Sequence, residues 1–172
     1  MQARLDPRKA APEAMKAMSN LHAYVGKCGL DHKLLELVKL RASQINSCAW
    51  CMDMHTKELR AAGEPEQRLY LLGAWKECPF YSERERAALA WTEALTLLTN
   101  GNVPDDVFAL ARAQFSEEEL VKLTLAIVAI NGANRINVAF RTVPGNYQPP
   151  SAVPPNDESR VFDFSSCDLH VD

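Results

Sequence analysis

The chain has 172 residues, of which 47% are hydrophobic and 24% are charged, and its formal net charge is −3. This length allows one domain with a sizeable core. The negative charge argues against nucleic acid as the main partner, because neutralising phosphates requires a basic surface. No stretch approaches the roughly 18 apolar residues of a membrane span, and the N-terminus shows no apolar signal-peptide segment. We therefore expect a cytoplasmic protein with neither a nucleic-acid nor a membrane partner.

Helical patterns fill the first part of the chain. Apolar residues recur at helical spacing over residues 11–27 and 32–45, and Asp31 stands where it can cap the second of these helices. A third helix is predicted over residues 48–62. The short polar turn at residues 46–47 predicts that the second and third helices form a hairpin.

The second part of the chain carries clear helix starts. A capping box at Ser82 opens a helix over 82–98, and a proline begins another over 104–113. A second capping box opens the most apolar helix, over about 117–139. The predicted fold class is therefore all-α, a helical bundle built around the hairpin.

Prolines become frequent after residue 141 and forbid regular helix there. We assign residues 1–141 to the helical domain and residues 142–172 to an extended, Pro-rich C-terminal arm of the same unit. Val161, Phe162 and Phe164 give this arm apolar side chains to bury, so we expect it to dock on a neighbouring surface.

The chain has five cysteines, an odd number that does not indicate a disulfide framework. In a reducing compartment, the close pair Cys48-x-x-Cys51 indicates catalysis or metal binding rather than structural cross-linking. Cys28, Cys78 and Cys167 have no partner at an informative spacing, and we interpret them as incidental thiols.

A histidine follows the cysteine pair at helical spacing. Residues three and four apart on a helix share a face, so Cys48, Cys51 and His55 are predicted to form one stripe of two thiols and a base. A free thiol with a pKa near 8.5 is only a few per cent thiolate at neutral pH, and a nearby base raises that fraction. Two thiols three residues apart can also form a disulfide after one of them is oxidised.

Glu36 is expected to reach this stripe across the hairpin. Counting outward from the turn, position 36 lies opposite about position 57 and position 38 opposite about position 55, so the carboxylate approaches His55. On one straight helix it would instead lie roughly 18 Å from Cys48. The predicted roles are Glu36 orienting His55, His55 acting as the base, and the two cysteines reacting.

The spacing Glu36-x11-Cys48-x-x-Cys51-x-x-x-His55 resembles the core signature of the AhpD-like alkylhydroperoxidases, which belong to the carboxymuconolactone decarboxylase superfamily. The flanking sequence LVKLRASQIN at residues 37–46 strengthens the resemblance. It covers about residues 15–145 of the chain.

The resemblance implies an all-α fold that oligomerises, commonly as trimers or hexamers, and a peroxiredoxin-type reduction of hydroperoxides with a dithiol electron donor. It places the sulfenic acid on Cys51, the partner thiol and proton donor on Cys48, and the proton relay on Glu36 and His55. No cofactor and no metal is expected. The best-studied peroxidases of the family carry a further histidine where this chain has Trp50, so a shorter relay and weaker activity are expected.

Other interpretations stay open on the residues alone. Cys48, Cys51 and His55, with Glu36, could hold zinc, although structural zinc sites usually draw on two separated ligand pairs. The chain could also be a non-enzymatic helical oligomer with a vestigial thiol pair. Glu36 by itself would more often pair with Lys39 on a solvated helix face. His22, which has no partner at an informative spacing, is expected at the surface, as are His32 and His170.

Overall fold

The computed structural model describes residues 2–149, and no β-strand occurs within them. The helices are α1 (Pro7–Ala10), α2 (Pro12–Gly26), α3 (His32–Ile45), α4 (Ala49–Ala61), α5 (Glu66–Leu71), α6 (Glu83–Thr96), α7 (Asp105–Gln114) and α8 (Glu117–Phe140), with short 3-10 helices η1 (Leu72–Glu77) and η2 (Leu98–Asn100). The predicted all-α class is confirmed.

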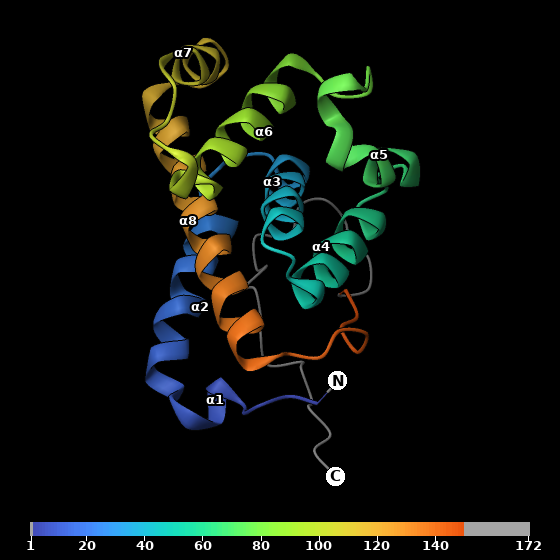
Figure 1. The fold of residues 1–172 in the computed structure, drawn as a ribbon, viewed down its shortest axis with the longest axis vertical. Helices are drawn as coiled ribbons and strands as arrows, with labels where there is room; N and C mark the ends of the chain where they lie inside the picture. The colour runs from blue at the N-terminus through green and yellow to red at the C-terminus, as the bar shows by residue number, and fades with distance from the viewer. Residues whose placement is uncertain (1, 150–172) are drawn as a thin grey trace.

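Helix α3 is the centre of the bundle (Figure 1). It packs against α4, α6 and α8, and α8 in turn packs along α2. Most of α3 is buried, including the two polar residues Glu36 and Lys39. Because several helices cover α3, a side chain on almost any of its faces is withdrawn from water.

The local signals in the sequence explain where these helices begin. The Asp31 side chain accepts a hydrogen bond from the backbone N–H of Leu34 at 2.8 Å, so it caps α3 as predicted. Ser82 and Ser116 form the two expected capping boxes. The sequence patterns did not predict α1, α5 and η1, because segments of four to six residues are too short to show a periodic pattern.

Helix α8 is long and apolar enough, by length and composition, to cross a membrane, and 39% of its most apolar 18-residue window is buried in the fold. The core helix of a soluble protein passes the same test, so length and composition are weak evidence for a membrane span. In this fold Leu123, Ile127 and Ile130 pack into the core. The cytoplasmic location stays a prediction.

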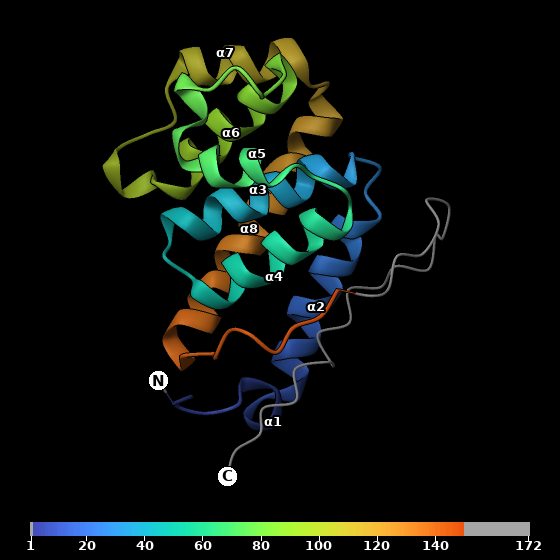
Figure 2. The ribbon, with the colours of Figure 1, turned by 90° about the vertical axis from the view of Figure 1, so that its right-hand side faces the viewer.

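The chain leaves α8 through Arg141 and runs past α4 (Figure 2). Lys57 on α4 donates hydrogen bonds to the carbonyls of Gly145 and Tyr147, at 3.0 and 2.9 Å, and Tyr147 is buried. The first residues of the predicted arm are thus docked on α4. Val161, Phe162 and Phe164 lie outside the described residues, so their docking and the division at residue 142 stay predictions.

Candidate active site

The reversal between α3 and α4 places both cysteines at the start of α4. Ser47 adopts a left-handed conformation with φ of 53°, and Cys48, as the N-cap of α4, bonds back to the carbonyl of Ser43 at 3.0 Å. Cys51 lies in the first turn. Both cysteines are reduced and buried, with exposed fractions of 1% and 0%.

Glu36 contacts His55 across the hairpin, as the turn at residues 46–47 led us to expect. The His55 Nδ1 atom lies 2.6 Å from Glu36 Oε2, and Lys39 Nζ donates to Glu36 Oε1 at 2.8 Å. Glu36 is fully buried, so its placement on a solvated face is wrong, although its pairing with Lys39 is present. An i, i+3 ion pair on a helix would ordinarily lie at the surface, but the helices packed around α3 bury the Glu36–Lys39 pair.

The carboxylate determines which nitrogen of His55 is available as a base. Burial alone raises the pKa of Glu36, but the adjacent charges of Lys39 and His55 lower it well below the ordinary value, so the group is a carboxylate. A carboxylate accepts, so Nδ1 carries the hydrogen and Nε2 holds the lone pair. Nε2 is buried and has no hydrogen-bond partner among the described residues. It is therefore placed to take up a proton.

The two thiols are hydrogen-bonded to each other and differ in acidity. The hydrogen bond from the Cys51 thiol lowers the pKa of Cys48. Hydrogen bonds from the backbone N–H groups of Cys51 and Trp50 also lower it, whereas burial raises it. The bond between the two thiols, together with burial, raises the pKa of Cys51. The first thiolate of the resting pair therefore forms on Cys48.

Three asparagines on α8 complete the surroundings of the cysteines and were missed as site residues by the sequence analysis. Asn137 Nδ2 contacts Cys51 Sγ at 3.4 Å, and Asn134 Nδ2 donates to Ser43 Oγ at 3.0 Å. The Asn46 amide, at the hairpin turn, donates to Asn131 and Asn134. The available signal was their spacing, since asparagines recur every three positions at 131, 134 and 137 of the most apolar predicted helix.

Trp50 lies between the cysteines in sequence and packs away from solvent. Its ring makes a T-shaped contact with Tyr147, with centroids 6.3 Å apart, and the Tyr147 hydroxyl donates to Glu58. Trp50, Tyr147 and both cysteines belong to one buried cluster. Trp50 thus contributes packing where a histidine would contribute a titratable group.

His22 on α2 is buried, with an exposed fraction of 4%, so the expectation of a surface position is wrong. Burial lowers its pKa from 6.5 to about 4, and the positive charge of Lys39 and the neighbouring His55 act in the same direction, while Glu36 opposes them. No local sequence pattern predicts that His22 is buried, because its burial depends on segments that are distant in the chain.

We expect the buried His22 to make the protein sensitive to mild acid. The unfolded chain takes up a proton at His22 below pH 6.5 and the folded chain only near pH 4, so stability falls as pH decreases across this range. At about 1.4 kcal/mol per pH unit, the loss of stability between pH 6.5 and pH 5 amounts to about 2 kcal/mol. Urea unfolding at pH 6.5 and 5 measures it, and His22→Gln should flatten the slope. An unchanged slope in that variant would contradict the assignment.

The other cysteines and histidines considered from the sequence lie away from this site or outside the described residues. Cys28 and Cys78 are buried in two other core clusters, and Cys167 and His170 lie outside the described residues. Within residues 2–149, no group of three or more His, Cys, Asp and Glu side chains is arranged to hold a metal ion. The zinc alternative therefore finds no preformed ligand set in this part of the chain.

Comparison with known proteins places this site in a family. A model of the carboxymuconolactone decarboxylase family matches residues 12–94. The uncharacterised protein YdfG of Bacillus subtilis (strain 168) is 44% identical over 140 residues, covering 81% of this chain and 95% of YdfG. The chain belongs to the carboxymuconolactone decarboxylase family.

Solved structures agree with this membership. A crystal structure from Agrobacterium tumefaciens, of a protein of unknown function described as a putative antioxidant defence protein AhpD, is 49% identical with a TM-score of 0.82, covering 84% of this chain and 99% of that one. A peroxidase-related protein with an AhpD core from Ralstonia eutropha JMP134, 17% identical, shares the fold with a TM-score of 0.71 over 81% of this chain and 74% of its own. The AhpD-like fold is therefore confirmed.

Proposed function

We propose that this member of the family is a thiol-dependent peroxidase that reduces hydroperoxides through a Cys48–Cys51 dithiol/disulfide cycle. The observation that carries the proposal is the buried, reduced cysteine pair at the start of α4, on the helix that also holds His55 against Glu36. A thiol pair, a base with a free lone pair and a carboxylate that orients the base are the groups that such a cycle requires.

The proposed cycle begins with a proton leaving the thiol pair for His55 Nε2. The charge forms first on Cys48, and the Cys51 proton then passes to Cys48 along the hydrogen bond between them. The Cys51 thiolate attacks the distal peroxide oxygen, so an S–O bond forms and the O–O bond breaks. The alkoxide takes the proton from Cys48 and leaves as an alcohol.

The second half of the cycle forms the disulfide. The Cys48 thiolate attacks the Cys51 sulfenic acid, the S–S bond forms, and hydroxide leaves as water with the proton from His55. Two thiols and one hydroperoxide thus give a disulfide, an alcohol and water. We propose that an external dithiol reduces the disulfide and that the enzyme works as a homo-oligomer, a trimer or hexamer.

Loss of free thiols on exposure to hydroperoxide tests this function. Fully reduced protein treated with one equivalent of cumene hydroperoxide should lose two thiols and two hydrogens of mass, because the cysteine pair closes. A variant with Cys28, Cys78 and Cys167 all changed to serine should lose the same two. If no thiols are lost in either protein, the peroxidase function is wrong, and metal analysis of the purified protein becomes the next measurement.

A further inference from the structure

The proposed cycle requires a negative charge on Cys51, although the resting pair forms that charge first on Cys48. The hydrogen bond to Cys48 and the loss of water around the sulfur both raise the pKa of Cys51. Because Cys51 is completely buried, bulk water does not solvate its thiolate. A hydrogen-bond donor fixed beside the Cys51 sulfur is therefore needed to hold the charge there.

Two asparagine side chains of α8 lie beside the cysteine pair. Asn134 hydrogen-bonds both thiols, so it supports a charge on either sulfur. Asn137 instead contacts the sulfur of Cys51, with its Nδ2 atom 3.4 Å from Sγ. Within the described residues, Asn137 makes no hydrogen bond to Cys48. Asn137 is thus the side chain that distinguishes between the two sulfurs.

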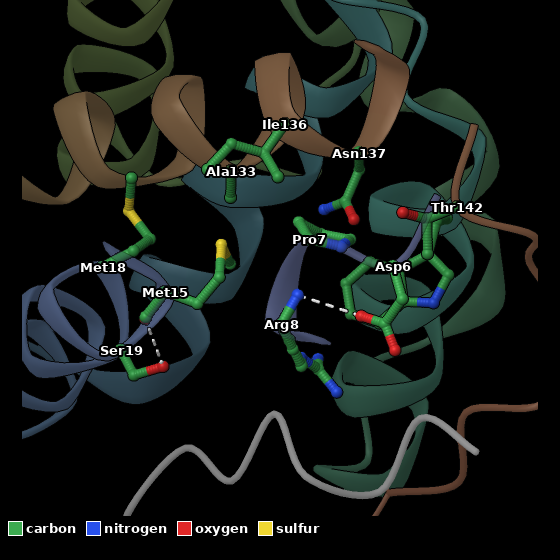
Figure 3. Close-up of a pocket in the computed structure, with 11 residues that line it drawn as sticks. Asp6, Pro7, Arg8, Met15, Met18, Ser19, Ala133, Ile136, Asn137 and Thr142 are labelled. Carbon is green, nitrogen blue, oxygen red and sulfur yellow. Dashed lines mark hydrogen bonds between the residues drawn. The ribbon is translucent and has the colours of Figure 1, made fainter. Parts of the chain in front are cut away.

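The end of α8 fixes the position of Asn137. The carbonyl of Asn137 accepts a hydrogen bond from the Thr142 N–H at 3.0 Å, which closes the last turn of the helix. Ala133, one turn earlier, packs in the same buried cluster as both cysteines. Figure 3 shows the Asn137 side chain projecting from α8 at the wall of a cavity of about 40 Å³. This cavity has room for water beside the amide, so the amide carbonyl can be hydrated while Nδ2 faces the sulfur.

We propose that Asn137 is a catalytic residue that selects Cys51 as the attacking thiolate. The inference rests on the proposed function. When the Cys51 proton passes to the Cys48 thiolate, an S–H bond breaks at Cys51, another forms at Cys48, and the negative charge moves to Cys51. The Asn137 N–H then donates to a charged sulfur instead of a neutral one, and hydrogen bonds to ionised groups are the stronger kind. No proton leaves Asn137, which acts only by stabilising the charge.

A protein with Cys51 as its single cysteine tests the proposal without any peroxide. The four other cysteines are first changed to serine: Cys28, Cys48, Cys78 and Cys167. The rate of alkylation by iodoacetamide, measured across pH, then reports the thiolate fraction of Cys51. The titratable groups of the neighbouring helices are the same in every variant: His22, Glu36, Lys39 and His55.

Two substitutions of similar size remove the donor. Asn137→Leu should lower the alkylation rate at pH 8 about tenfold and move the midpoint of the pH profile upward by about one unit, because a hydrogen bond to the charged form is lost. Asn137→Asp should move the midpoint further, since it adds a negative charge beside the sulfur. A midpoint that is unchanged in Asn137→Leu would overturn the proposal.

Asn131→Leu, on the same helix, is the matched control for a purely structural role. Asn131 accepts a hydrogen bond from Asn46 and donates to Thr96, so its loss should lower stability. Asn46 keeps its bond to Asn134, and no donor to sulfur is removed. We therefore expect the alkylation rate of Cys51 to change less than about twofold in this control.

A second measurement, on the chain with all five cysteines, separates failure of this inference from failure of the proposed function. With less than one equivalent of iodoacetamide, the ratio of label on Cys51 to label on Cys48, read by peptide mass, should fall about tenfold in Asn137→Leu. An unchanged ratio would show that Asn137 does not select between the thiols. A lowered ratio, in a protein whose wild type does not react with cumene hydroperoxide, would support the role of Asn137 and overturn the peroxidase function.

Discussion

Cys51→Ser should lower the rate of reaction with cumene hydroperoxide by at least about a hundredfold, because a serine hydroxyl is not ionised near neutral pH and cannot attack the peroxide. Cys48→Ser should still react once, leaving a sulfenic acid on Cys51 that dimedone traps, because the attacking thiol is kept and the resolving thiol is missing. This reaction should be slower than in wild type, because Cys48 also relays the proton. Stopped-flow peroxide consumption and intact mass measure both results.

The same pair of variants decides the order of the two thiols. The hydrogen bond between them makes Cys48 the more acidic thiol in the resting pair, so our assignment requires proton transfer before Cys51 attacks. Cys28→Ser, in a separate core cluster, is the control and should react like wild type. A reactive Cys51→Ser beside an inert Cys48→Ser would reverse the assignment and make Cys48 the attacking residue.

Glu36→Ala should destabilise the protein by about 3–5 kcal/mol, because it removes the buried carboxylate that faces both the ammonium group of Lys39 and the ring of His55. Lys39 is 2% exposed and lies 2.8 Å from the carboxylate that the variant removes. The change also frees the His55 ring, so peroxide reduction should weaken together with stability. Urea unfolding at pH 7 measures the first effect.

An exposed ion pair supplies the matched control for Glu36. Glu118→Ala removes the partner of Lys122 on α8, and since the Glu118 side chain is 77% exposed, the cost should stay below about 1 kcal/mol. A double variant, Glu36→Leu with Lys39→Met, should recover much of the stability, since neither charge of this buried pair remains. A loss below about 1 kcal/mol in Glu36→Ala would contradict the stabilising role assigned to this buried carboxylate.

Local sequence patterns predicted most of the helices and the core of the site. The caps at Asp31, Ser82 and Ser116 identified three helix starts, since each places a side-chain oxygen on backbone N–H groups that the helix leaves unpaired. The spacing of Cys48, Cys51 and His55 placed them on one helix for the same local reason. Glu36 required one further step, the hairpin turn at residues 46–47, and the contact with His55 is present.

Contacts between distant segments could not be predicted in this way. Asn137 lies 86 residues from Cys51 in the chain, and no local sequence pattern predicts the helix against which α8 packs. His22 was expected at the surface for the same reason, because a single histidine in α2 gives no sign that segments distant in the chain will bury it. A cavity between α1, α2 and the end of α8 is lined by Asp6 near one end of the described chain and by Thr142 near the other, so it forms only when the bundle assembles.

The sequence by itself determined the all-α class, the family, and the stripe of thiols and base, because these depend on hydrogen bonding, capping and spacing within a few helical turns. The tertiary structure decided which groups are desolvated. Packing around α3 buries the Glu36–Lys39–His55 cluster, and the assembled bundle brings Asn137 to Cys51. Burial depends on every helix that covers a residue, so it is a property of the assembled fold.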